Sequence, residues 1–155
     1  MAGPAFIELL KATLGEGAPI TFRARGSSMH PFIKDGDVIT VSPLRGGAPG
    51  TGDVVAFAQR ETDTEKLVVH PVILTKANAC FIKGDGTTGG VDVPVPAADL
   101  LGLVTKVERG GRRVFIGLGP ERFLIALLTR KGLTVPLVQV AAKLLRPIRY
   151  IVCSV

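Results

Sequence analysis

Glycine and proline divide this chain into short segments, and no other feature restricts its fold as strongly. The 155 residues include 19 Gly and 11 Pro. The runs between them are short and apolar, and several alternate with polar residues, as strands with one buried face do. Frequent turn residues favour strands joined by turns over a helical bundle. We therefore expect a mainly β (α+β) fold.

The pattern predicts one helix near the N-terminus, followed by strands. Apolar residues at helical spacing predict a short amphipathic helix over 4–14, with Pro4 at its start and Gly15 at its end. Strands are expected over residues 19–25, 38–41, 54–58, 67–75, 79–83, 101–109 and 112–117. Gly110-Gly111 predicts a two-residue hairpin turn between the last two. Residues 60–65 are expected to form a hairpin tip, 84–91 a glycine-rich loop and 94–99 a connector.

The C-terminal quarter of the sequence differs in character from the rest. Residues 121–131 and 134–145 place apolar side chains at helical spacing among scattered cations, which predicts two amphipathic helices. We therefore expect a β domain over 1–118 and a helical extension over 119–155. The favoured interpretation is that these helices pack on the β domain or on a partner subunit. A basic contact with anionic lipid through 121–150 is the alternative.

Charge and cysteine content narrow the classes of function. The net charge of +6 suits anionic partners such as nucleic acid or a membrane surface. The sequence has no helix-turn-helix pattern, zinc-ligand spacing or aromatic-basic interleaving, so no nucleic-acid partner is expected. Cys80 and Cys153 are isolated, which suggests inert thiols in a reducing compartment, with a single disulfide as the alternative. With no secretory signal and no uncharged apolar run of the ~18 residues that span a bilayer, we expect a cytoplasmic protein whose membrane association is at most peripheral.

Two serines lie in a loop suited to presenting a nucleophile. The stretch Arg25–Ile33 follows an extended segment and is closed by the turn Asp35-Gly36-Asp37. A serine hydroxyl at its ordinary pKa is a poor nucleophile and needs a neighbouring base. The chain has two histidines. His30 is expected to be an exposed loop residue, whereas His70 lies in an apolar, β-branched run that predicts a strand. Taken alone, the serines would be turn residues and His70 a core histidine.

Five motifs occur in one order along the chain. They are Gly26-Ser27-Ser28-Met29-His30-Pro31, Asp35-Gly36-Asp37, Gly52-Asp53-Val54-Val55-Ala56-Phe57, Val68-Val69-His70 and Phe81-Ile82-Lys83-Gly84-Asp85. This series resembles the signal peptidase I family of serine peptidases, in its Ser–His, endoplasmic-reticulum-type branch, and more distantly the LexA-like self-cleaving repressors. The resemblance covers roughly Phe22 to Glu108. It implies a LexA/signal-peptidase-like fold of short, coiled antiparallel sheets with a short N-terminal helix.

The resemblance also implies a catalytic Ser–His dyad or Ser–His–Asp triad. Ser28 precedes Met29 as in the family's Ser-Met motif, so it would be the nucleophile. His70 would take the proton of the Ser28 hydroxyl as general base. An aspartate would fix the tautomer of the ring. Asp92 is favoured over Asp85 for this role, and a turn aspartate is the alternative interpretation of either.

The remaining site residues are expected beside the serines. The backbone N–H of Ser28, with Ser27, would stabilise the oxyanion. Met29, Pro31 and Phe32 would form an apolar floor for small substrate side chains, with ordinary core packing as the alternative. Neither a cofactor nor a metal is expected. The implied function is a serine endopeptidase that hydrolyses an extended peptide, such as a leader or signal-like segment of a protein, through an acyl-enzyme.

Two departures from the family pattern leave other functions open. Pro71 follows His70 where the family usually has arginine, and Gly26 stands where many signal peptidases carry a hydroxyl. One alternative is therefore a catalytically silent, peptide-binding member of the same fold. Another is a LexA-like self-cleaving regulator that lacks its DNA-binding domain, although no Ala-Gly or Cys-Gly scissile pair stands out in a linker. Asp37 and Asp53 are expected to be turn formers rather than catalysts.

Overall fold

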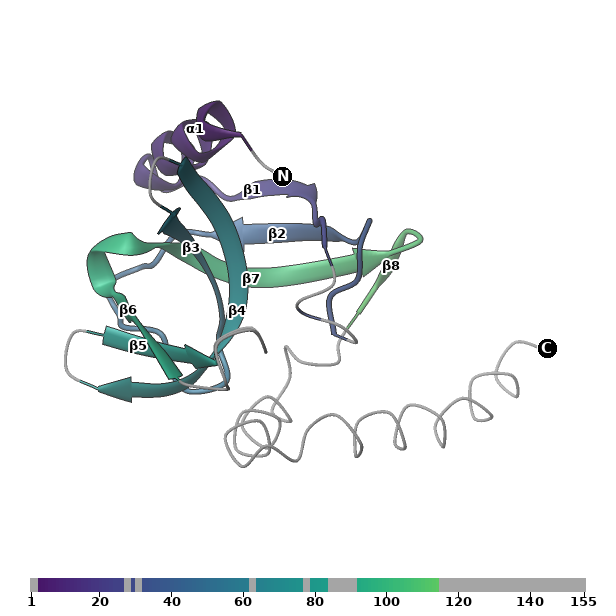
Figure 1. Cartoon of the computed structure of the whole chain (residues 1–155). Helices are drawn as coiled ribbons and strands as arrows, with labels where there is room; N and C mark the ends of the chain where they lie inside the picture. The colour runs from purple at the N-terminus through teal and green to yellow at the C-terminus, as the bar shows by residue number, and fades with distance from the viewer. Residues whose placement is uncertain are drawn as a thin grey trace, which may run out of the picture.

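The fold is given by a computed structural model (Figure 1). It describes residues 3–26, 29, 32–61, 64–76, 79–83 and 92–114. Within these ranges the chain forms one N-terminal α-helix, one short 3-10 helix and an antiparallel sheet of eight strands. The expectation of a mainly β (α+β) fold is therefore confirmed.

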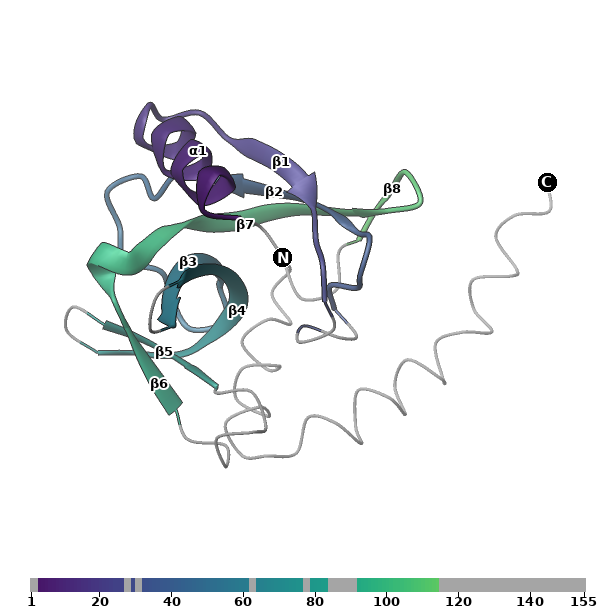
Figure 2. The same ribbon diagram turned by 45° about the horizontal axis from the view of Figure 1, so that its top comes forward.

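Seven of the eight strands form one path, in which only β7 departs from chain order, and β8 lies off this path. The strands are β1 (Ile20–Arg23), β2 (Val38–Ser42), β3 (Val54–Glu61), β4 (Thr64–Lys76), β5 (Ala79–Lys83), β6 (Asp92–Pro96), β7 (Leu100–Arg109) and β8 (Arg112–Arg113). The 3-10 helix η2 (Ala97–Asp99) links β6 to β7. The order is β1-β2-β7-β3-β4-β5-β6, and β8 pairs with β7. The chain thus returns after β6 to place β7 between β2 and β3. Figures 1 and 2 show the long strand β4 curving from β3 toward β5.

Helix α1 (Pro4–Gly15) packs against β1, β4 and β7. Pro4 occupies the first turn, where its missing N–H breaks no helical hydrogen bond. Ile7, Leu10 and Leu14 recur at helical spacing and are buried. Lys11 adds an ion pair with β4, since its Nζ lies 2.9 Å from a carboxylate oxygen of Glu65. The predicted helix over 4–14 is confirmed.

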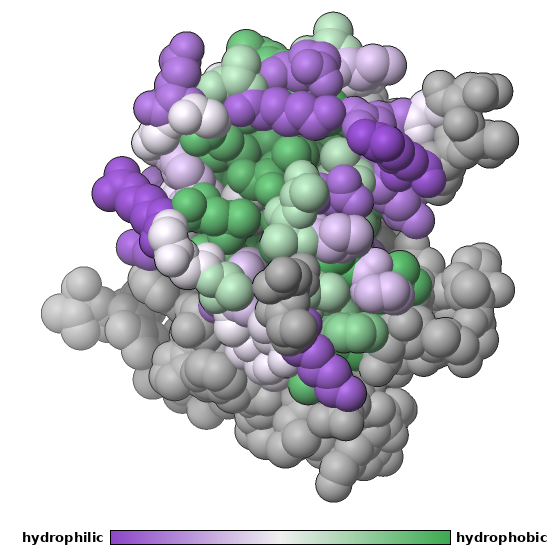
Figure 3. All heavy atoms as spheres, turned by 90° about the vertical axis from the view of Figure 1, so that its left-hand side faces the viewer, coloured by the Kyte–Doolittle hydropathy of each residue, from purple (hydrophilic) through white to green (hydrophobic). Residues whose placement is uncertain are grey.

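Two hydrophobic clusters cover the two faces of the β3–β4 hairpin. The helix-side cluster consists of Leu10, Leu14, Met29, Ile33, Ile39, Val41, Val54, Ala56, Val104 and Val107. The distal cluster consists of Val55, Phe57, Val72, Cys80, Ile82, Val95 and Leu100. Successive residues of β3 alternate between the two clusters because strand side chains point alternately to opposite faces. Figure 3 shows hydrophobic residues in the middle of one face of the molecule, with hydrophilic residues along its upper rim.

Gly102 allows β7 to pass closely between β2 and β3. Strand β7 pairs with both neighbours, and both ladders shift register near this glycine. A Cβ built on Gly102 would lie 2.5 Å from the Ser42 carbonyl oxygen and 2.8 Å from Val41 Cγ1. Because the nearer atom belongs to the backbone, a side chain here would require one strand to move.

Two expected connections are wrong. Strand β3 continues to Glu61 and β4 begins at Thr64, so residues 62–63, rather than 60–65, separate the strands. The charged residues there support the pairing, as Arg60 Nε lies 3.6 Å from Glu65 Oε1. The expected connector over 94–99 is instead the end of β6 followed by η2. Its two prolines indicated a loop, but β6 is the outer strand of the sheet, where a missing N–H breaks no ladder bond.

The predicted Gly110-Gly111 turn is confirmed. Both glycines have positive φ, 57° and 76°, as this tight hairpin turn requires. The pairing continues past β8, where the Val114 N–H donates to the Val107 carbonyl oxygen at 2.8 Å. Residues 84–91 and 115–155 lie outside the described residues. The loop expected over 84–91, the helices expected over 121–131 and 134–145, and the domain division at 118 therefore stay predictions. In the described ranges, no helix is long and apolar enough to cross a membrane.

Candidate active site

The structure describes only part of the predicted site. Ser27, Ser28, His30, Pro31 and Asp85 lie outside the described residues. Met29, Phe32 and His70 are described, and Asp92 is placed in a strand. The surroundings of the site are therefore built from the residues that flank the serines and from the strands around His70. The meeting of Ser28 with His70 stays a prediction.

The chain is anchored immediately before the serines. The Gly26 N–H donates to Asp35 Oδ1 at 2.9 Å, and the φ of 101° at Gly26 is one that side-chain-bearing residues rarely adopt. The Ala24 N–H donates to the Asp37 carbonyl oxygen at 2.7 Å, and the Gly36 N–H donates to the Ala24 carbonyl oxygen at 2.9 Å. The Asp35-Gly36-Asp37 turn thus holds this end of the loop.

The chain is anchored again immediately after the serines. The Met29 carbonyl oxygen accepts hydrogen bonds from the Phe32 N–H at 2.9 Å and the Ile33 N–H at 3.0 Å. The side chains of Met29 and Ile33 are buried in the helix-side cluster, whereas Phe32 is half-buried. Positions 27 and 28 therefore lie between two fixed points. Met29 is a core residue, and contacts of Met29 or Phe32 with substrate stay predictions.

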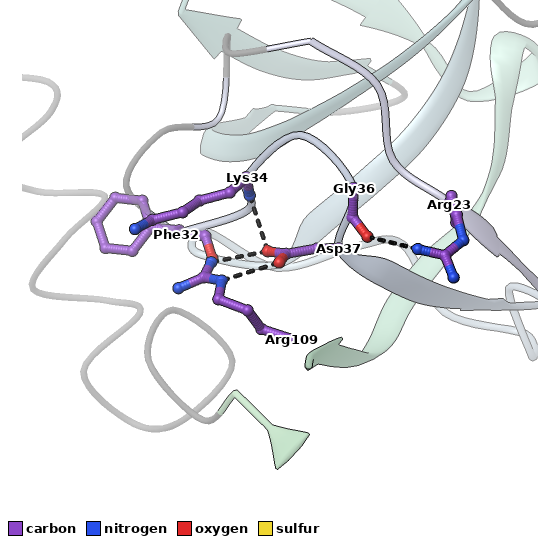
Figure 4. Close-up of polar contacts among 6 residues, drawn as sticks. All are labelled: Arg23, Phe32, Lys34, Gly36, Asp37 and Arg109. Carbon is purple, nitrogen blue, oxygen red and sulfur yellow. Dashed lines mark hydrogen bonds and ion pairs between the residues drawn. The ribbon is translucent and has the colours of Figure 1, made fainter. Parts of the chain in front are cut away.

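Arg109 of β7 ties the same loop to the sheet (Figure 4). Its Nε donates to Asp37 Oδ1 at 2.8 Å and its Nη2 donates to Asp37 Oδ2 at 2.7 Å, a bidentate pair. Nη2 also donates to the Phe32 carbonyl oxygen at 3.2 Å. The Lys34 N–H donates to Asp37 Oδ2 at 2.8 Å. We refer to these contacts as the Asp37–Arg109 clamp.

The clamp keeps Asp37 ionised in a site where it is only 2% exposed. Burial by itself would raise the pKa of Asp37, but the hydrogen bonds from Arg109 and from the Lys34 N–H outweigh it, so the pKa lies below its ordinary value. The hydrogen bond to Asp37 raises the pKa of Arg109. Asp37 is a turn former, as predicted, and it is also half of an ion pair between residues 72 positions apart.

His70 lies within β4, opposite Val55 of β3, and is 7% exposed. The turn before β3 holds β4 two residues beyond the histidine. There the Val72 N–H donates to the Asp53 carbonyl oxygen at 2.8 Å. The carboxylate of Asp53 accepts the Gly50 N–H at 2.8 Å, which confirms Asp53 as a turn former. The imidazole is thus carried by a strand whose position is fixed from the β3 side.

One edge of β4 pairs with β3. Before His70, the opposite edge, which we call the second edge, pairs with no described strand. β3 pairs with β4 over residues 64–71, whereas β5 pairs with its other edge only from Val72 onward. Val72 directs its N–H and its carbonyl oxygen toward the β3 side. Because backbone groups alternate between the two edges, those of Leu67 and Val69 are directed to the second edge. Pro71 belongs to the same series, so its missing N–H costs no bond with β3.

Met29 and His70 lie on opposite faces of the β3–β4 hairpin. His70 shares a face with its cross-strand neighbour Val55, which belongs to the distal cluster. Met29 belongs to the helix-side cluster together with Val54 and Ala56. Met29, the described residue after the serines, therefore packs on one face of the hairpin, and the imidazole of His70 is directed to the other.

Asp92 begins β6, directly after the residues expected to form the glycine-rich loop. It pairs with Lys83 of β5. The strand forms here because Val95, three residues later, packs in the distal cluster while the alternate residues face outward. The roles of Asp92 and Asp85 as partners of His70 stay predictions.

Sequence reasoning missed Arg109. In the sequence it is one of three arginines around a Gly-Gly turn, and nothing local distinguishes it from a solvent-exposed hairpin cation. The signal lay at Asp37: a carboxylate in a turn between apolar runs is a candidate for burial, and a buried carboxylate needs a cation. The sequence could not indicate which cation meets it.

No bound group defines the chemistry of this region. Within the described ranges, no group of three or more His, Cys, Asp or Glu side chains is placed to hold a metal ion. Cys80 is a free cysteine in the distal cluster, and its burial raises the pKa of its thiol. Comparisons with protein-family models, with curated proteins and with solved structures each found no match.

Proposed function

We propose that this chain is a serine endopeptidase that hydrolyses an extended peptide through an acyl-enzyme. Ser28 is the nucleophile and His70 is the general base. The proposal is supported by the ordered motif series and by one structural observation: the loop that carries the serines is held on both sides, and no described strand pairs with the second edge of β4 before His70.

The substrate would bind by adding a strand to the second edge of β4. The outward-directed backbone groups of Leu67 and Val69 would pair with the peptide backbone, as in other strand-addition complexes. The outer strand β6 is less suited to this, because Pro94 and Pro96 remove two N–H donors from its free edge. A peptide on this edge of β4 would run past the strand position of His70.

The reaction would proceed in two proton-balanced steps. Ser28 Oγ attacks the peptide carbonyl carbon while its proton passes to His70, and the proton then moves to the leaving amine as the C–N bond breaks. Water attacks the resulting ester, gives a proton to His70, and Ser28 regains a proton as the acid departs. A positioned base contributes roughly 10²–10⁴-fold to such a reaction. The backbone N–H of Ser28 would bind the oxyanion, because Gly26 offers no hydroxyl.

A catalytically silent peptide-binding protein is the second candidate. It is favoured by the placement of Met29 and His70 on opposite faces of the hairpin and by Pro71, which replaces the arginine that usually follows the histidine in the resembling family. Such a protein would keep the open edge of β4 and bind the same extended peptides without forming an acyl-enzyme.

Labelling with a fluorophosphonate probe tests the nucleophile. We expect labelling of the wild type and of Ser27→Ala, which removes the neighbouring hydroxyl, and no labelling of Ser28→Ala or His70→Ala. If Ser27→Ala lost labelling and Ser28→Ala kept it, the nucleophile would be Ser27 and the assignment to Ser28 would be wrong. An unlabelled wild type that still binds peptide would support the silent binder. A shortened product from the wild type, absent in Ser28→Ala, would indicate self-cleavage.

Peptide affinity tests the binding edge independently of chemistry. Both variants are made in a Ser28→Ala background. Val69→Pro replaces the valine side chain and also removes the outward backbone N–H, whereas the matched Val69→Ala truncates the side chain and keeps the N–H. Loss of one backbone hydrogen bond predicts roughly 2- to 12-fold weaker binding for the proline variant relative to the alanine variant. Equal affinities of the two variants, each folded by circular dichroism, would show that the peptide does not pair with this edge.

A further inference from the structure

The charge of this protein is concentrated at one end. Residues 1–114 contain 13 Lys or Arg and 12 Asp or Glu, so that part of the chain is nearly neutral. Residues 115–155 contain six Lys or Arg and one Glu, which accounts for five of the six net positive charges. The last described residue before that segment, Val114, follows β8, which forms a hairpin with β7 at one end of the sheet (Figure 1).

The nearly neutral part is itself divided by the fold. One end, which we call the basic end, holds Arg23, Arg25, Lys34, Lys106, Arg109, Arg112 and Arg113 against Asp35, Asp37 and Glu108. The rest of residues 1–114 holds six Lys or Arg and nine Asp or Glu. The described positive charge of the β domain is therefore unevenly distributed, with an excess of four positive charges at the end where β8 lies.

Strand register places two arginines of the basic end on one face of the sheet, with Glu108 between them. Arg23 of β1 pairs with Val38, Val38 with Glu108, and Glu108 with Arg113 of β8. This row of four residues crosses three strand spacings of about 4.8 Å, so its two arginines are roughly 14 Å apart. Directly paired residues share one face of a sheet. Arg25 and Arg112 extend the positive surface along the adjoining loop and the hairpin tip.

The acidic residues of the basic end offset only part of its positive charge. Asp37 is buried in the clamp with Arg109. Asp35 is exposed and accepts the Gly26 N–H, and Glu108 lies 3.0 Å from Lys106 Nζ. Seven cations against three carboxylates leave an excess of four positive charges, and Arg23, Arg25 and Arg112 are exposed. This excess favours an anionic partner.

We propose that the basic end is a docking surface for an anionic phospholipid bilayer. The proposal is independent of the peptidase assignment. It also goes beyond the lipid contact considered for residues 121–150, because it gives the β domain a lipid-binding face of its own. A bilayer is favoured over nucleic acid by the sequence that continues from this end, where cations alternate with apolar runs, as in interfacial segments. The chain also has only seven Phe, one Tyr and no Trp, few rings for stacking on bases. Docked in this way, the serine loop would face the membrane surface.

Vesicle co-sedimentation of the full chain tests the proposal with two charge-matched variants. The first is Arg23→Gln/Arg25→Gln/Arg112→Gln at the basic end. The second is Arg45→Gln/Arg60→Gln/Lys76→Gln, which removes three exposed cations elsewhere. Both variants keep residues 115–155 unchanged, so a difference between them reports on the β domain. The vesicles contain phosphatidylcholine with about a quarter phosphatidylglycerol. Pure phosphatidylcholine vesicles serve as the uncharged control.

We expect the basic-end variant to partition on the order of 100-fold more weakly than the wild type, from roughly fivefold for each cation near an anionic surface. The matched variant should stay within about threefold, and wild-type binding should disappear on uncharged vesicles and at high salt. Equal effects of the two variants, or no effect of either, would overturn the proposal and assign any binding to net charge or to residues 115–155. A wild type that binds a short DNA duplex but not the anionic vesicles would overturn it in favour of nucleic acid.

Discussion

Replacing Arg109 by methionine removes the cation of the clamp and leaves the Asp37 carboxylate buried. Breaking a buried ion pair by deleting one partner costs about 3–5 kcal/mol. The Arg109 side chain is 37% exposed, whereas Asp37 is 2% exposed, so water that enters the vacated position lowers the cost. We expect Arg109→Met to reduce the free energy of unfolding by about 2–3 kcal/mol.

The reciprocal variant is predicted to cost less. Asp37→Asn removes the charge from the buried side and leaves Arg109 able to reach solvent, so the loss resembles that of a partly exposed pair, about 1 kcal/mol. The asparagine oxygen can still accept the Lys34 N–H. The double variant should therefore be no less stable than Arg109→Met alone, because it no longer contains an unpaired buried carboxylate.

Urea unfolding followed by circular dichroism measures these differences. With a slope of about 1.5 kcal/mol per molar urea, Arg109→Met should lower the midpoint by roughly 1.3–2 M at pH 7. The reasoning would be refuted if Asp37→Asn proved as costly as Arg109→Met, or if Arg109→Met changed the midpoint by less than about 0.3 M. Either result would mean that the carboxylate does not depend on the guanidinium.

The pH dependence supplies a second check on the clamp. The pKa of Asp37 is lowered in the folded state, so its stabilising contribution is present above the unfolded-state pKa of ~3.9 and is lost as the pH falls through the folded-state pKa. In Arg109→Met the burial that raises this pKa is no longer opposed by the cation. The stability difference between wild type and Arg109→Met should therefore be largest near neutral pH and narrow below about pH 4.

Three further predictions concern packing and burial. Leu10→Ala should cost about 2–5 kcal/mol because Leu10 is fully buried, whereas the adjacent Leu9→Ala, at 56% exposed, should change the urea midpoint little. Gly102→Ala should cost about 1–3 kcal/mol, since its Cβ would meet a backbone oxygen at 2.5 Å, while Gly47→Ala, with open space around it, should be neutral in the same assay. Burial raises the pKa of the Cys80 thiol, so iodoacetamide at pH 8 should alkylate Cys80 only in urea; mass spectrometry of the native protein showing prompt alkylation would contradict this.

Several elements could be predicted from the sequence because local physics decides them. The helix over 4–14 follows from apolar spacing with Pro4 and Gly15 at its ends, and the β7–β8 turn follows from two glycines that alone tolerate the required φ. Asp53 as a turn former is equally local. The two errors, at 60–65 and 94–99, came from polar and proline residues that indicate loops in isolation. Cross-strand pairing and an edge position overrode that local preference.

The sequence by itself determined most of the strands, the Gly110-Gly111 turn and the order of the motifs on which the peptidase proposal rests. Only the tertiary structure decided that Arg109 meets Asp37, that β7 lies between β2 and β3, and that the cations gather at one end. It also placed Met29 and His70 on opposite faces of one hairpin. These relations depend on strand order and register between distant segments, and a one-residue change in register would reverse every face. Local periodicity fixes which residues alternate, whereas the neighbour that each face meets is fixed only when the whole sheet closes around its two clusters.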